Sequence, residues 1–121
     1  MKYKYVDTGE TRSLGKPAKG SEHTWFQKIH YYITSADTLE ESSYDVIFVD
    51  GRARVAVAMH MWRYFNPRTV LFVHDFWRTK YHVHLEYYEL IFEVDSLAVL
   101  KRKVGKGSNI PDSTNKFIDW L

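Results

Sequence analysis

Three aspartates stand where short runs of β-branched and aromatic residues stop. They are Asp7, Asp50 and Asp75, and His74 comes directly before the last of them. If the runs before Asp50 and Asp75 form neighbouring strands, their carboxylates share one sheet edge, since neighbouring strands lie about 4.8 Å apart. Two such carboxylates can hold a divalent cation, or orient a hydroxyl and take its proton. His74 is a further candidate base because imidazole titrates near neutral pH.

Each of these residues also has a structural explanation. An Asp after a strand often forms a turn or caps a helix, because its side chain accepts hydrogen bonds from backbone N–H groups. His74 lies at the end of a predicted strand and can be a hydrogen-bonded core residue. Arg52 and Arg54 flank the turn after Asp50, where they either bind an anionic group or point into solvent.

The spacing of apolar residues predicts the elements that position these side chains. Unbroken apolar runs predict strands, and such runs are typical of parallel strands covered on both faces; at the start of the chain, Tyr3 and Tyr5 alternating with polar neighbours also predict a strand. Apolar residues at helical spacing predict the helices between them. The predicted strands are Lys2–Asp7, Val46–Val49, Thr69–Val73, Ile91–Val94 and Leu97–Leu100, and the predicted helices are Ser21–Ile33, Ala53–Phe65 and Thr79–Tyr88. Only two residues separate the last two strands, which predicts an antiparallel hairpin.

Alternating strands and helices predict an α/β fold whose ligand site lies beyond the carboxyl ends of the strands. The 121 residues, 45% of them hydrophobic, fit one small domain with a packed core. There is no cysteine, and the longest apolar runs are far shorter than the roughly 20 residues that span a bilayer. A net charge of +2 favours neither nucleic acid nor an acidic membrane. We therefore expect no nucleic-acid partner, no membrane segment and, without a secretory signal, a cytoplasmic location.

Several segments resemble the carboxyl-terminal half of a known family. Tyr44–Gly51, which reads YDVIFVDG, and Val70–Phe76, which reads VLFVHDF, resemble the fourth and fifth strands of class I S-adenosylmethionine-dependent methyltransferases. Tyr88–Val94 and Leu97–Lys101 resemble the sixth and seventh strands, the hairpin that distinguishes this fold from other Rossmann domains. Val6–Thr11 resembles the third strand and its exit loop.

This resemblance implies a fold class and a division of the chain. The expected fold is a partial Rossmann-like methyltransferase sheet over residues 1–103, mostly parallel with a carboxyl-terminal antiparallel hairpin. Residues 104–121 are expected to form a tail. Arg78 and the pair Tyr81-His82, which follow the second motif, make the chain most similar to methyltransferase-like proteins associated with glycan modification.

The resemblance also implies roles for individual residues. Asp7 matches the acidic position that contacts the adenine side of S-adenosylmethionine, and Asp50 matches the position that faces the methyl group and the substrate. In metal-dependent sugar and catechol O-methyltransferases, carboxylates after the fourth and fifth strands hold Mg²⁺, and Asp50 and Asp75 occupy comparable places. The expected catalytic residues are Asp50, His74 and Asp75, and the expected substrate-binding residues are Arg52, Arg78, Tyr81 and His82.

The chain also departs from the family's pattern. The family binds its cofactor on a Gly-rich loop after the first strand, but no G-x-G sequence precedes Asp50. About half a methyltransferase domain is therefore expected, with an open parallel edge that a partner chain or self-association would complete. The expected function is S-adenosylmethionine-dependent O-methylation of a sugar or glycan hydroxyl. The alternative is a non-catalytic fragment or interaction module with the same fold.

Overall fold

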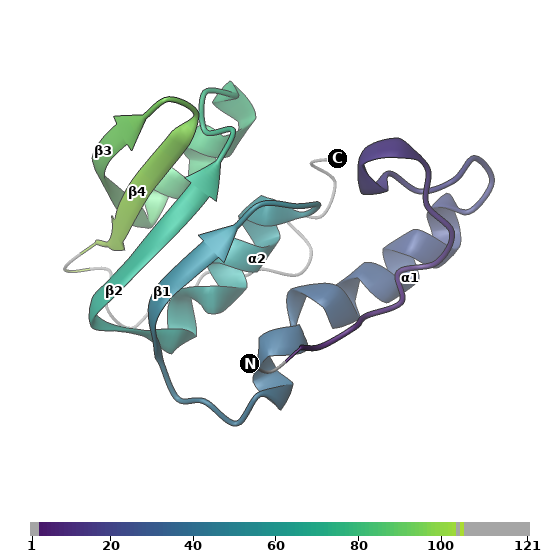
Figure 1. Cartoon of the computed structure of the whole chain (residues 1–121), viewed down its shortest axis with the longest axis horizontal. Helices are drawn as coiled ribbons and strands as arrows, with labels where there is room; N and C mark the ends of the chain where they lie inside the picture. The colour runs from purple at the N-terminus through teal and green to yellow at the C-terminus, as the bar shows by residue number, and fades with distance from the viewer. Residues whose placement is uncertain (1–2, 104, 106–121) are drawn as a thin grey trace.

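The computed structural model describes residues 3–103 and 105 and contains a four-stranded sheet (Figure 1). The strands are β1 (Tyr44–Val49), β2 (Phe65–His74), β3 (Tyr88–Val94) and β4 (Leu97–Arg102). Their order is β1-β2-β4-β3, in which β1 and β2 are parallel and the other two pairings are antiparallel. The predicted terminal hairpin is confirmed. With one parallel pairing out of three, the described sheet is mixed rather than mostly parallel.

Helical segments form where the sequence predicts them, with changes of length and type. They are α1 (Glu22–Ile33), α2 (Arg54–Met61) and the 3₁₀ segments η1 (Ser13–Gly15), η2 (Ser35–Thr38), η3 (Trp62–Tyr64) and η4 (Thr79–Glu86). Ser21 occupies the N-cap position of α1, but its side chain makes no capping hydrogen bond. The second predicted helix ends at Met61 as an α-helix, because the chain tightens into η3 before β2 begins at Phe65.

One face of the sheet packs against α2 and η4, which lie behind it in Figure 1. Ile47 of β1 and Leu71 of β2 are buried on this face. Trp62 lies edge-on against Tyr88 with ring centroids 5.3 Å apart, and the Tyr88 hydroxyl donates a hydrogen bond to the Ala58 carbonyl at 2.5 Å. Such an aromatic pair contributes about 0.5–1.5 kcal/mol beyond its buried area. These contacts hold α2 against the sheet and thereby fix the turn that precedes it.

The other face of the sheet is apolar but open. Val46 and Phe48 are 61% and 59% exposed, whereas Ile47 and Val49 are buried. The expectation that this strand is covered on both faces is therefore wrong for the described chain, because the β1-to-β2 crossover places α2 on one face only. By strand register, this face includes Val46, Phe48, Val70, Phe72, Phe92 and Val94, together with Val99, which is buried between Phe72 and Phe92.

The strand expected over Lys2–Asp7 is not formed in the described residues, which contain no strand before β1. The segment instead runs beside α1, as Figure 1 shows, and Lys4–Asp7 line a small pocket together with Tyr31 and Thr34. A strand needs a neighbour for its backbone hydrogen bonds, and within the described chain β1 pairs only with β2. The described sheet therefore has a single parallel pairing, that of β1 with β2.

No helix among the described residues is long and apolar enough to cross a membrane. The tail expected over 104–121 lies outside the described residues except for Gly105. The domain boundary after residue 103 therefore stays a prediction.

Candidate functional site

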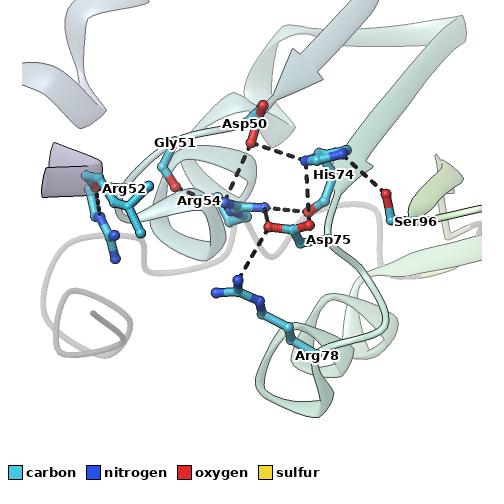
Figure 2. Close-up of polar contacts among 9 residues, drawn as sticks. Asp50, Gly51, Arg52, Arg54, His74, Asp75, Arg78 and Ser96 are labelled. Atoms are coloured by element: carbon cyan, nitrogen blue, oxygen red, sulfur yellow. Dashed lines mark hydrogen bonds and ion pairs between the residues drawn. The ribbon is translucent and has the colours of Figure 1, made fainter.

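The carboxyl ends of β1 and β2 carry three residues that the sequence singles out. Asp50 directly follows β1, His74 ends β2, and Asp75 follows in a left-handed conformation with φ of 58°. Because β1 and β2 are parallel neighbours, the three residues meet at one edge of the sheet. His74 Nδ1 lies 3.4 Å from Asp50 Oδ1 and 3.6 Å from Asp75 Oδ1 (Figure 2). The structure thus brings the three candidate catalytic side chains together.

Arg54, the first residue of α2, occupies the centre of this cluster (Figure 2). Its side chain is 9% exposed, and its guanidinium lies 3.5 Å from Asp50 Oδ1 and 3.6 Å from Asp75 Oδ2. The guanidinium also donates a hydrogen bond to the His74 carbonyl and lies 4.7 Å from the centroid of the Tyr81 ring. A buried charge is tolerated when nearby charges and acceptors replace its hydration. Arg54 therefore joins the turns after β1 and β2 into one unit.

This guanidinium bears on the magnesium site expected at Asp50 and Asp75. It lies within 3.6 Å of both carboxylates, so the protein itself supplies the positive charge between them. Nowhere in the described part of the chain do three His, Cys, Asp or Glu side chains gather closely enough to hold a metal ion. Mg²⁺ demands near-octahedral oxygen coordination. The described residues therefore do not fit a magnesium site on their own.

Ser96, from the turn between β3 and β4, completes the surroundings of His74. Its hydroxyl lies 3.1 Å from His74 Nε2, whereas Nδ1 faces the two carboxylates (Figure 2). Carboxylates favour a proton on the ring nitrogen that faces them, so we assign the proton of neutral His74 to Nδ1. Nε2 then carries the lone pair and accepts a hydrogen bond from Ser96. In this state Nε2 is the nitrogen that can take a proton from a bound hydroxyl.

A pocket of about 250 Å³ opens beside this cluster. Three of the four expected substrate-binding residues, Arg52, Arg78 and Tyr81, line it together with the candidate catalytic residues. Arg52 Nε donates a hydrogen bond to the Leu14 carbonyl at 2.6 Å, which ties η1 to the turn after β1. Arg78 Nη2 lies 3.6 Å from Asp75 Oδ2. The pocket therefore places cations that can orient a polar substrate beside His74, whose Nε2 faces Ser96 at a position outside the pocket lining.

Asp7 lies apart from this pocket. Its carboxylate lies 2.8 Å from the Lys28 ammonium and accepts a hydrogen bond from the Gly9 N–H at 2.8 Å. The Lys28 hydrogen bond is the largest of the effects that lower the pKa of the Asp7 carboxyl. Asp7 and Asp50 line different pockets. The described residues assigned to S-adenosylmethionine thus do not form one complete cofactor site, and of the two only Asp50 lines the pocket beside His74.

His82 also lies outside the pocket beside His74, although the resemblance implies a substrate-binding role for it. Its Nε2 lies 3.0 Å from the Phe76 carbonyl, and its ring packs on the Phe76 ring with centroids 5.0 Å apart. These contacts hold the start of η4 against the turn after β2. In the described structure His82 is a packing residue.

The sequence did not indicate the roles of three residues near the pocket. Arg54 was considered for anion binding or solvent exposure, yet it is the buried centre of the cluster. Ser96 gave no signal, because nothing local connects a hairpin turn to His74. Tyr32 lies close enough that a Cβ on Gly51 would stand 2.8 Å from its hydroxyl, and burial raises the pKa of Tyr32.

Comparisons with known proteins support the fold. No family model and no curated protein sequence matches the chain. A similar solved structure is that of a methyltransferase-like protein from Silicibacter pomeroyi DSS-3, with a TM-score of 0.70 and 24% sequence identity. The match covers 82% of this chain and 50% of that protein, so this chain spans about half of its length. The chain therefore has a methyltransferase-like fold.

Proposed function

We propose that this chain forms the acceptor side of an S-adenosylmethionine-dependent O-methyltransferase that acts on a sugar or glycan hydroxyl. The observation that carries the proposal is the orientation of His74, with Nδ1 toward two carboxylates and Nε2 toward a hydroxyl. The methyltransferase-like fold supports it, because ligands of such sheets bind beyond the carboxyl ends of the strands. S-adenosylmethionine, when bound, supplies the methyl group.

The residues of this chain bind, orient and deprotonate the acceptor. The acceptor hydroxyl takes the place of the Ser96 hydroxyl at His74 Nε2, and its proton passes to that nitrogen as the oxygen is methylated. The resulting imidazolium is stabilised by the two carboxylates beside Nδ1, Asp50 and Asp75. Arg54 keeps both carboxylates in place through its ion pairs. No step in this scheme requires a metal ion.

Replacing the base tests this scheme. In the complete methyl-transferring assembly, His74→Gln is expected to lower kcat by at least about 100-fold, the usual contribution of a general base. The measurement is transfer of labelled methyl groups from S-adenosylmethionine to a panel of oligosaccharides. His23→Gln is the matched control, because His23 lies exposed on α1 and contacts Gln27. Equal rates for the wild type and His74→Gln would contradict a role for His74 as base.

The open face supports a second function, that of an interaction module whose sheet is completed by a partner chain or a second copy. Val46 and Phe48 are more than half exposed on a strand whose outer edge has no partner strand among the described residues, which is an unusual place for large apolar side chains. Burying both would contribute about 25 cal/mol for each Å² of apolar surface removed from water. This association is compatible with the methyltransferase proposal, because a partner chain that supplies the missing half of a methyltransferase domain would also complete the sheet.

Phe48→Lys is expected to abolish this association and to leave the fold of the monomer intact, because Phe48 has few neighbours to lose. The measurement is light scattering after gel filtration over a range of protein concentrations, with circular dichroism as the check of folding. Tyr31→Lys is the matched control, since Tyr31 is 66% exposed on α1, away from the sheet. A wild-type chain that stays monomeric at every concentration would show that the sheet is not completed by self-association.

A further inference from the structure

The charges of the side chains that line the pocket beside His74, which we take as the acceptor pocket, do not sum to zero. Three arginines line it, Arg52, Arg54 and Arg78, against two carboxylates, those of Asp50 and Asp75. With His74 neutral, the pocket keeps one positive charge. A charged pocket with partly buried walls concentrates ions of opposite sign. The surplus therefore favours a negatively charged ligand.

The arginines differ in how many carboxylates and hydrogen-bond acceptors their guanidinium groups already contact. Arg54 is buried and contacts both carboxylates, so it has little capacity for a ligand. Arg78 has a 42% exposed side chain, and among the described residues it has one ion pair, with Asp75 at 3.6 Å, and lies 5.2 Å from the centroid of the Trp77 ring. Arg52 has no carboxylate within ion-pair distance among the described residues, and only its Nε is engaged, with the Leu14 carbonyl. Arg52 and Arg78 are thus the cations available to a bound anion.

The surroundings of Tyr81 are also positively charged. The Tyr81 ring forms a buried wall of the pocket, and the Arg54 guanidinium lies 4.7 Å from its centroid. The Lys80 ammonium lies 5.2 Å from the same centroid. The ring therefore attracts two cations to this side of the pocket. Lys80 does not line the pocket, so its charge is not part of the surplus counted above.

We propose that the acceptor carries an oxyanion, either a carboxylate or a phosphate, which binds between Arg52 and Arg78 while the reacting hydroxyl faces His74. This inference rests on the proposed function and adds the chemical class of its substrate. Guanidinium groups suit it because they pair with carboxylates and phosphates through two parallel hydrogen bonds. The alternative is that the arginines only neutralise Asp50 and Asp75, but Arg52 contacts neither of them.

Binding to the 121-residue chain, without any cofactor, tests the inference. Isothermal titration compares three probes: methyl glucoside, the corresponding uronic acid glycoside, and inorganic phosphate. We expect at least one anionic probe to bind about tenfold more tightly than methyl glucoside, and its affinity to fall with added salt. Arg52→Gln and Arg78→Gln are each expected to weaken that binding about tenfold. Arg68→Gln is the matched control, because Arg68 is 82% exposed and pairs with Asp45 outside the pocket.

The outcomes separate this inference from the proposed function. Binding of the uronic acid glycoside supports a carboxylate on the acceptor, and binding of phosphate alone supports a phosphate. Equal binding of charged and neutral probes, or anion binding that neither Arg52→Gln nor Arg78→Gln weakens, would overturn the inference. An anion that binds through Arg52 and Arg78 in a protein without methyl-transfer activity would support the site and contradict the methyltransferase proposal.

Discussion

Replacing Arg54 with methionine is expected to lower the free energy of unfolding by roughly 1–3 kcal/mol, because the His74 carbonyl and two partly exposed carboxylates lose their charged partner. Methionine fills a similar volume but leaves the carboxylates of Asp50 and Asp75 facing one another without the cation between them. The His74 carbonyl also loses its hydrogen bond, and the Tyr81 ring loses the guanidinium beside it. Few other single changes would disturb both turns of the site at once.

Urea unfolding followed by circular dichroism measures this effect. Arg68→Met is the matched control, because its ion pair with Asp45 is exposed on both sides and should contribute less than about 1 kcal/mol. Adding Asp50→Asn and Asp75→Asn to the Arg54→Met variant should recover part of the lost stability, since the unpaired charges are then gone. If Arg54→Met were as stable as the control, Arg54 would not be the residue that holds the cluster together.

The second large effect is a loss of stability in acid that depends on His84. This side chain is fully buried, and burial is the main cause that lowers its pKa from 6.5 to about 4. Between these values the unfolded chain binds a proton that the folded chain does not, so stability falls as pH decreases from about 6.5 to 4. The shift corresponds to roughly 3 kcal/mol at the acid end of this window.

The measurement is the free energy of unfolding at several pH values, for the wild type and His84→Asn. Asparagine retains a donor for the Tyr81 carbonyl, which His84 Nδ1 contacts at 2.5 Å, but does not titrate. Carboxylates also contribute to acid unfolding, so the difference between the two pH profiles isolates His84. His23→Asn, an exposed histidine, should leave the profile unchanged. Parallel profiles for the wild type and His84→Asn would show that His84 is not the titrating group.

The fold was predictable where local pattern and tertiary structure agree. The motifs in Tyr44–Gly51 and Val70–Phe76 predicted two neighbouring parallel strands, and the short turn before Leu97 predicted the hairpin. The pattern misled where a strand depends on a neighbour. Lys2–Asp7 alternates like a strand, but no strand lies beside it in the described part of the chain. An apolar run such as Val46–Val49 does not reveal which of its faces is covered.

The site was predictable in its carboxylates and histidine, because the ends of neighbouring parallel strands must meet. Arg54 could not be placed from the sequence, since its burial depends on where α2 packs against the sheet. Ser96 reaches His74 only because β4 pairs with β2, a contact between residues 22 positions apart. Asp7 lies apart from the site, because the strand expected to carry it is not formed in the described residues.

The most direct test of the methyltransferase proposal is a titration of the 121-residue chain with S-adenosylhomocysteine, followed by amide proton–nitrogen correlation spectra. These spectra detect binding in the millimolar range, which is what half of a cofactor site can provide. We predict shifts at Asp50–Arg52 and at His74, with little change along β3. An absence of shifts at these two turns, or shifts confined to other parts of the chain, would contradict the proposal that S-adenosylmethionine presents its methyl group to this site.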